Sequence, residues 1–222
     1  MPLLFGAMCT YILNDLDDLE KDRINHPNRP LPSGQVSTAF VAVLYYVCLA
    51  LALLTTHFYV GRTKSAFLYY VGFSACISYR YVVEYLPAFK PSYVAATTTI
   101  PILILMTFYP NDASSLAQTG VALFLSMMGR ELCKDLPDRP GDPVSFLHKF
   151  DPTAVARFAF AMQGLAVMIL CWQIRGLASS ICMLAMVLVL AMAYVCWFHQ
   201  NRQTVALGLM KTVALFGLYF LL

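Results

Sequence analysis

The sequence has little charge for its length. Only 12% of its 222 residues are Asp, Glu, Lys or Arg, whereas about 25% is usual in a soluble domain. Hydrophobic residues make up 59% of the chain and its mean hydropathy is +0.66, more apolar surface than a soluble domain could bury. The net charge of +3 is scattered over predicted loops, which argues against a nucleic-acid partner. These values predict an integral membrane protein.

The sequence also lacks cysteine motifs for metals and signatures for nucleotide, haem or iron–sulfur cofactors. Its seven cysteines lie mostly within apolar runs and have no close metal-ligand spacing. Such cysteines are typical of small buried hydrophobic residues rather than of disulfides or zinc ligands. No nucleotide-binding, haem or iron–sulfur signature is present.

Long apolar runs, divided by short polar segments, fill most of the chain. The predicted full spans are residues 36–60, 65–86, 92–110, 114–133, 153–174, 177–198 and 203–222, each long enough to cross a bilayer. Residues 1–13 are too short to span, so we interpret them as part of a helix that leaves the membrane near Asn14 and stops around Asp22. The sequence therefore predicts an all-α, multi-span transmembrane bundle of about eight helices, the first one partial, in a single domain of residues 1–222.

Basic residues in alternate loops predict the orientation. Eleven lie on one side of the predicted membrane and three on the other, which favours the first side as cytoplasmic. An even number of spans separates two acidic segments, so both lie on this cytoplasmic side. The topology therefore allows them to meet.

The first acidic segment, Asn14 to Gly34, reads NDLDDLEKDRINHPNRPLPSG and contains five acidic side chains and three prolines. The second, KDLPDRPGD at Lys134 to Asp142, repeats its spacing 120 positions later. The matched pairs are Asp15 and Asp135, Asp18 and Asp138, and Asp22 and Asp142. One acidic loop is usually just solvated, but two with matched spacing on one side make that interpretation improbable.

On a helix, four oxygen-bearing side chains of the first segment share one narrow face: Asn14, Asp15, Asp18 and Asp22. Carboxylates placed so closely repel one another unless a cation lies among them. Carboxylate and amide oxygens suit Mg²⁺, which also accepts phosphate oxygens as ligands. The second segment should present the same face on a helix distorted by Pro137 and Pro140.

Two such faces at the mouth of an apolar bundle predict a site for Mg²⁺ and a diphosphate. If the group attached to the diphosphate is a long isoprenoid, its tail can lie in the bundle interior and ionisation leaves an allylic cation. Metal ions would neutralise the leaving diphosphate, and the bundle interior would shield the resulting allylic cation from water. Basic side chains suited to phosphate oxygens are candidate diphosphate ligands. They are Arg23, Arg29, Lys90, Arg130 and Lys134.

The first segment, with the pattern NDxxDxxxDRxNHPxRPLxSG, resembles the UbiA superfamily of intramembrane prenyltransferases. The second, RELCKDLPDRPGD, is similar to the form found in lipid- and homogentisate-type branches of that superfamily. The resemblance implies an Mg²⁺-dependent transfer of a polyprenyl group from its diphosphate to an aromatic or lipid-like acceptor. It also implies that the metal–diphosphate is bound by Asn14, Asp18, Asp22, Asp135, Asp138 and Asp142, of which Asp18, Asp22, Asp138 and Asp142 are the expected catalytic carboxylates.

The resemblance also implies a tyrosine and a basic residue after the fourth family helix, for which Tyr79 or Tyr81 and Lys90 are the nearest candidates. Family members usually have nine spans, and the first has no counterpart here. The chain would be either a shortened member or a sequence without its true start.

Two alternatives remain open at this stage. A membrane terpene cyclase would ionise the same prenyl diphosphate without an acceptor. A transporter or non-catalytic membrane protein would need charges along a path through the membrane, whereas here they gather on one side. The prenyl chain length, acceptor, organelle and oligomeric state are not encoded in these motifs.

Overall fold

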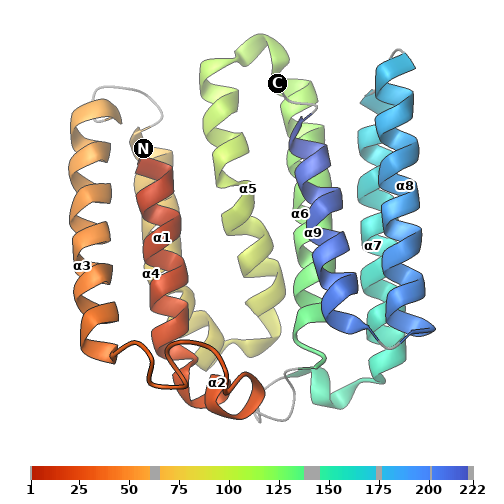
Figure 1. The fold of residues 1–222 in the computed structure, drawn as a ribbon. Coiled ribbons are helices and arrows are strands. Elements are labelled where there is room, and N and C mark those ends of the chain that lie inside the picture. Colours follow the sequence, from red (N-terminus) through yellow and green to blue (C-terminus); the bar gives the residue numbers. More distant parts are fainter. Residues whose placement is uncertain (1, 61–65, 138–145, 174–176, 201, 220–222) are drawn as a thin grey trace. The chain divides into compact units, whose positions relative to one another are not determined.

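The structure is a computed structural model that describes residues 2–60, 66–137, 146–173, 177–200 and 202–219. These residues form nine α-helices and contain no strand (Figure 1). They divide into two compact units, one ending at Pro87 and the other containing the described residues from Ala88 onward. The predicted all-helical class is confirmed.

The first unit packs α1 against α3 and α4. Its helices are α1 (Pro2–Asp17), α2 (Leu19–Asn25), α3 (Thr38–Thr55), which continues as a π-helical turn (Thr56–Val60), and α4 (Ala66–Tyr85). Small residues of α1 lie at these contacts. A Cβ added to Gly6 would lie 3.4 Å from the Phe73 ring of α4, and the buried Cys9 thiol lies 3.9 Å from the carbonyl oxygen of Tyr45 in α3.

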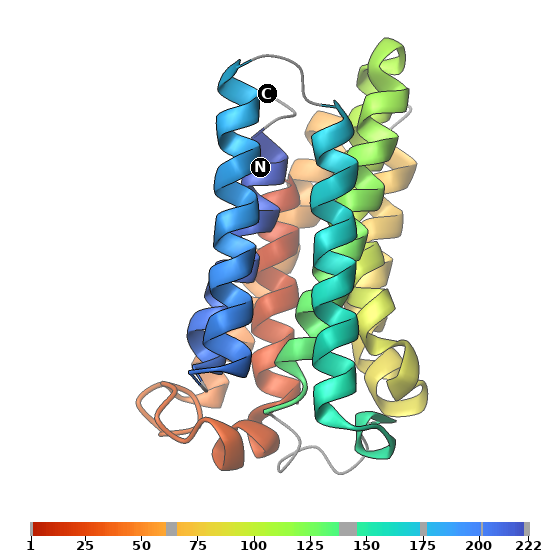
Figure 2. The same cartoon turned by 90° about the vertical axis from the view of Figure 1, so that its right-hand side faces the viewer.

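The second unit is arranged around α6. Its helices are α5 (Lys90–Phe108), α6 (Ala113–Lys134), α7 (Pro152–Gln173), α8 (Leu177–Phe198) and α9 (Gln203–Tyr219), with 3-10 turns at Pro87–Phe89, Pro110–Asp112 and Phe146–Lys149. α6 packs against α5, α7 and α9, while α8 packs against α7 and α9. Figures 1 and 2 show that the start of α5, the end of α6, the start of α7 and the end of α8 lie at one end of this unit.

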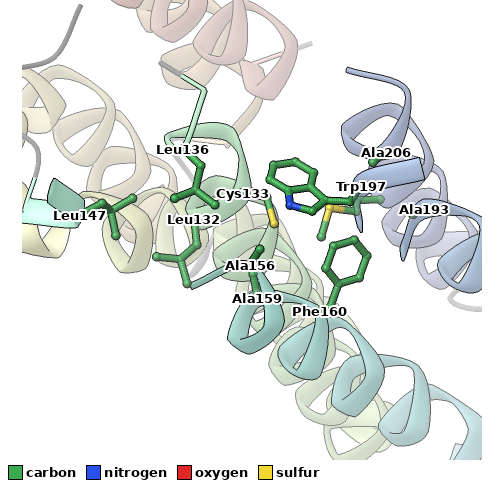
Figure 3. Packing of buried hydrophobic residues seen from close by; sticks show 11 residues of the cluster. Leu132, Cys133, Leu136, Leu147, Ala156, Ala159, Phe160, Ala193, Trp197 and Ala206 are labelled. Carbon is green, nitrogen blue, oxygen red and sulfur yellow. The ribbon is translucent and has the colours of Figure 1, made fainter. Parts of the chain in front are cut away.

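The core of the second unit joins α6 to α7, α8 and α9. Figure 3 shows the Phe160 ring of α7 beside the Trp197 indole of α8, with Cys133 of α6 and Ala206 of α9 in the same buried cluster. Much of the α7 contribution is alanine, which lets the helices approach closely. This cluster lies next to the C-terminal end of α6, so it fixes the helix that leads into the second acidic segment.

α6 and α7 come into backbone contact at Gly129. A Cβ added there would lie only 2.6 Å from the carbonyl oxygen of Ala159, so a larger residue would collide with backbone. One turn earlier, the fully buried Gln163 of α7 accepts a hydrogen bond from the Ser126 hydroxyl at 2.9 Å and donates one to the Ser126 carbonyl at 2.8 Å. These contacts fix the register of α7 on α6.

The predicted spans agree closely with the helices. Four described helices are long and apolar enough to cross a membrane: Thr38–Phe58, Pro87–Phe108, Pro152–Gln173 and Ser180–Phe198. α4, α6 and α9 coincide with the other three predicted spans. The single-domain assignment and the cytoplasmic orientation remain predictions.

The first helix differs from the expectation at its end. It is interrupted at Asp18 and α2 then continues to Asn25, instead of stopping around Asp22. The interruption is slight, because the Asp22 N–H still donates to the Asp18 carbonyl at 2.8 Å.

Candidate functional site

The first acidic segment presents its oxygen donors along one helical face. The Asp18 N–H donates to the Asn14 carbonyl and the Asp22 N–H to the Asp18 carbonyl, each at 2.8 Å. Asn14, Asp18 and Asp22 are therefore successive helical turns apart, and their side chains lie on one side. Asn14 and Asp18 are half-buried, Asp22 is buried and Asp15 is exposed.

The loop after α2 returns a basic side chain to this face. The Arg29 guanidinium donates to the Asp22 carboxylate at 2.6 Å. Backbone hydrogen bonds from Arg29 to the His26 carbonyl and from Ser33 to the Arg29 carbonyl fold the loop, and Gly34 adopts a φ of +78°, which glycine tolerates best. The proline-rich loop thus holds Arg29 against the carboxylate that is most buried in the segment.

The other charges of α2 are arranged differently. Arg23 donates to Glu20 at 2.7 Å, and both side chains are largely exposed. Lys21 lies 3.8 Å from Asp18. Of the two arginines predicted as diphosphate ligands in this segment, Arg29 lies on the donor face, whereas Arg23 is paired on the exposed side.

In the second unit, Lys90 at the start of α5 forms an ion pair with Asp135 at the end of α6. The Lys90 ammonium lies 2.9 Å from the Asp135 carboxylate, and their side chains are only 14% and 8% exposed. Burial raises the pKa of Asp135, while the positive charge of Lys90 acts in the opposite direction. Asp135 caps the end of α6, so the pair fixes the point at which the chain leaves this helix.

A second buried acidic residue, Glu131, was not identified from the sequence. It forms ion pairs with Arg130 and, at 3.8 Å, with Lys134. The spacing of three between Glu131 and Lys134 was the available signal, because such residues are neighbours on a helix. Glu131 thus positions two of the basic residues that the sequence assigns to the diphosphate.

The end of α6 therefore carries an excess of positive charge. Three cations of α5 and α6 (Lys90, Arg130 and Lys134) lie among two carboxylates (Glu131 and Asp135). Lys211 of α9 lies close enough to interact electrostatically with Arg130, Lys134 and Glu131, so cations exceed carboxylates by 4 − 2 = 2. The Arg130 Nε is buried and has no hydrogen-bond acceptor among the described residues. This end of the unit can accept an anion that brings oxygen acceptors with it.

The expected helix through the second acidic segment is wrong for residues 135–137. α6 ends at Lys134 and a turn follows, because the residue before a proline is disfavoured in the α conformation and Pro137 lacks a helical N–H donor. Asp138 and Asp142 lie outside the described residues.

The two tyrosines considered from the family resemblance lie on α4. Tyr79 is half-buried, whereas Tyr81 is exposed and stacks on Tyr85, with 6.5 Å between the ring centroids.

The donors on the first acidic segment suit Mg²⁺, since they are carboxylate and amide oxygens. Within the described part of the chain, however, no three His, Cys, Asp or Glu side chains converge on one point. A metal bound there would need further oxygen ligands, which a diphosphate or water can provide.

Comparison with known proteins gives the family. The model of the UbiA prenyltransferase family matches residues 2–217. The chain belongs to this family. Its motif resemblance to UbiA proteins is thereby confirmed, and the chain is a multi-pass integral membrane protein.

Curated relatives of this UbiA-family chain include two archaeal proteins named digeranylgeranylglyceryl phosphate synthase. The protein from Methanocaldococcus jannaschii is 30% identical over 148 residues, which cover 61% of this chain and 47% of the relative. The protein from Pyrococcus furiosus is 33% identical over 146 residues, which cover 62% and 49%. The chain spans about half the length of the curated relatives it matches.

A solved structure has the same fold. It is described as "Structural and mechanistic insights into the biosynthesis of Digeranylgeranylglyceryl phosphate synthase in membranes". The similarity has a TM-score of 0.61 at 20% identity and covers 97% of this chain and 78% of the other. At this identity the likeness supports the UbiA-type helical fold alone.

Proposed function

We propose that this UbiA-family chain transfers a prenyl group from its diphosphate to a nucleophilic acceptor in the membrane, with the help of Mg²⁺. The observation that carries the proposal is the pairing of acidic and basic side chains at the polar ends of apolar helices. Asp22 is held by Arg29 in the first unit, and Asp135 by Lys90 in the second.

The carboxylate and amide donors of the first segment would hold the metal, and the matched aspartates of the second segment are proposed to act on the same diphosphate. The proposed set is Asn14, Asp15, Asp18, Asp22, Asp135, Asp138 and Asp142. When bound, Mg²⁺ neutralises negative charge on the leaving diphosphate.

Basic side chains would bind the diphosphate oxygens that the metal does not. Arg130 is suited to this because its buried Nε has no acceptor among the described residues and because guanidinium groups bind phosphate bidentately. Lys134 and Lys90 supply further positive charge at the same end of α6. Together they favour departure of the diphosphate by stabilising its charge.

The bond changes follow from this arrangement. The carbon–oxygen bond between the prenyl group and the diphosphate breaks, and the diphosphate leaves with the electron pair. The acceptor then forms a new bond to the prenyl carbon and loses a proton. The apolar helices would hold the isoprenoid chain and exclude water, which would otherwise capture the cation.

The acceptor is proposed to be lipid-like, with an aromatic compound as the alternative. Support for this order comes from the names of the relatives, which specify a glyceryl phosphate product. The first acceptor to test is therefore a glyceryl phosphate that already carries one prenyl ether.

The test is release of diphosphate by purified protein in detergent, with Mg²⁺ and geranyl, farnesyl or geranylgeranyl diphosphate. Each substrate is assayed with and without the prenylated glyceryl phosphate and a panel of phenols. We expect release coupled to an acceptor product, and loss of both in Asp18→Asn and Asp135→Asn. Glu20→Gln is the matched control, since Glu20 is an exposed carboxylate on α2. A cyclic product formed without an acceptor would instead identify a cyclase.

Metal binding is tested separately from activity. Mn²⁺ in place of Mg²⁺ gives an electron paramagnetic resonance signal that changes on protein binding. We expect the bound signal to require a thio-analogue of the prenyl diphosphate and to be weakened by Asp18→Asn but not by Glu20→Gln. Binding that is unaffected by Asp18→Asn would contradict the assigned donor face.

A further inference from the structure

An apolar groove runs between α7 and α8 of the second unit. It is shallow and largely open, with a volume of about 410 Å³. Its lining includes Phe160, Ala161, Val187, Leu190, Arg157 and Tyr194. Arg157 is the single charged residue of this lining, so the groove is an apolar surface with one cation.

The lining of the groove extends along both helices. From Val187 to Tyr194 it follows eight residues of α8, and the seven steps between them span about 10 Å along a helix axis. Two alanines, Ala161 and Ala191, contribute to its lining and leave the space that larger side chains would fill. A segment of acyl chain fits along such a path, and in a bilayer hydrocarbon is the available occupant.

The polar end of the groove is defined by Arg157 and Tyr194. Figure 2 shows that the first turns of α7 and the last turns of α8 lie at the same end of the unit. Arg157 is exposed, and its guanidinium has no ion pair or hydrogen bond among the described residues. The acidic residue nearest to it in the sequence, Asp151 just before α7, has another partner: its carboxylate accepts a hydrogen bond from the Ala154 N–H at 2.7 Å.

Tyr194 is held beside Arg157 by aromatic packing. Its ring lies 5.4 Å from that of Phe160 and 4.6 Å from that of Phe198, as measured between centroids. Aromatic side chains with a polar tip are enriched where hydrocarbon meets headgroups. The end of the groove thus combines a cation with a phenol at the level expected for lipid headgroups.

We propose that this groove binds an anionic glycerophospholipid, with an acyl chain between α7 and α8 and the headgroup phosphate on Arg157. A phosphodiester carries one negative charge, which matches the single cation of the lining. A prenyl diphosphate fits less well, because the lining contains no carboxylate to hold its metal. A second copy of the chain also fits less well, since it would bury Arg157 at a desolvation cost.

The chain offers its own reporter for this site. It has two tryptophans: Trp172, which is 87% exposed, and Trp197, which is 8% exposed. Trp197 lies 6.4 Å from the groove residue Phe160, between ring centroids. In a Trp172→Phe background, quenching of Trp197 fluorescence by lipids with brominated acyl chains reports occupancy of the groove.

The experiment places this protein, one chain per disc, in nanodiscs of phosphatidylcholine that contain increasing fractions of brominated lipid. We expect brominated phosphatidylglycerol to half-saturate quenching at about a fivefold lower fraction than brominated phosphatidylcholine, as one basic residue near the headgroup contributes. Arg157→Gln should remove this difference, and Ala161→Phe should reduce quenching because it fills the groove. Arg202→Gln is the matched control, since Arg202 is exposed just after α8, and it should leave the difference intact.

Four results would overturn the proposal. They are equal quenching by the two brominated lipids, a preference that survives Arg157→Gln, an equal loss in Arg202→Gln, and relief of quenching by added farnesyl diphosphate. The last would assign the groove to the prenyl substrate. In discs prepared with two chains, relief of quenching would also overturn the proposal and would assign the groove to self-association. Thermal unfolding of each variant in the same discs identifies any that fails to fold, and Ala161→Ser then replaces Ala161→Phe as a smaller change with a smaller expected effect.

Discussion

Replacement of Gly129 by alanine tests the close contact of α6 and α7. The new Cβ would lie 2.6 Å from the Ala159 carbonyl oxygen. An ordinary contact begins at 3.4 Å, so the helices must separate locally by 3.4 − 2.6 = 0.8 Å or shift by an equivalent amount. The obstructing atom belongs to backbone, which cannot rotate away as a side chain would.

The same displacement would strain the neighbouring hydrogen bonds between Ser126 and Gln163. They measure 2.9 and 2.8 Å, and an added 0.8 Å takes them beyond the range of a protein hydrogen bond. Overpacking costs about 1–3 kcal/mol and each lost hydrogen bond about 0.5–1.5 kcal/mol, while alanine recovers about 1 kcal/mol of helix propensity. The net expectation, with both hydrogen bonds lost, is a decrease of roughly 1–5 kcal/mol in the free energy of unfolding.

The assay is thermal unfolding of the purified protein in detergent. A loss of that size lowers Tm by about 2–4 °C per kcal/mol for a chain of this length. Gly164→Ala is the matched control on α7, because no atom lies within 4 Å of its added Cβ; its Tm should be unchanged or raised. A Gly129→Ala protein whose Tm equals or exceeds that of the Gly164→Ala protein would refute the argument from close approach.

Three further predictions concern the charged groups. Lys90→Met leaves the buried Asp135 without its nearest cation and should lower the free energy of unfolding by about 3–5 kcal/mol. Adding Asp135→Asn to this variant should recover most of the lost stability. A double variant no more stable than Lys90→Met would contradict the pairing. Arg29→Gln should change the free energy of unfolding by less than about 1 kcal/mol, because Arg29 is 47% exposed. It should nevertheless slow diphosphate release by about 10²-fold if Arg29 stabilises the leaving group. A variant that releases diphosphate as fast as the unmodified protein would show that Arg29 is not part of the site. Chelation of divalent metal with EDTA should stop diphosphate release and added Mg²⁺ should restore it, whereas release that persists after chelation would contradict the metal requirement.

The helices could be predicted from the sequence because each is a run of apolar residues bounded by polar or proline-containing segments. The face formed by Asn14, Asp18 and Asp22 was likewise predictable, since helical spacing is a local property. The helix predicted beyond Lys134, distorted by Pro137 and Pro140, was wrong: Pro137 ends α6 at Lys134 rather than distorting a continuing helix.

The long-range pairs could not have been predicted from spacing. Lys90 and Asp135 are 45 residues apart, and Ser126 and Gln163 are 37 apart. Each pair depends on how two helices pack, which the pattern of one chain does not specify. Glu131 was overlooked because an acidic residue beside two basic ones resembles an ordinary solvated cluster, although its side chain is only 5% exposed.

The packing of α6 has a consequence for biosynthesis. This helix packs against three others in the second unit and its 22 residues are long enough to cross a bilayer, yet it is not apolar enough to be counted as a span by itself. Its buried Ser126 finds its partner, Gln163 of α7, only within the folded unit. Insertion of an isolated helix into lipid depends on its own hydropathy, so the low hydropathy of α6 disfavours its insertion alone. We therefore expect α6 to leave the translocon together with α7 rather than alone, so that the release of this helix waits for the synthesis of the next.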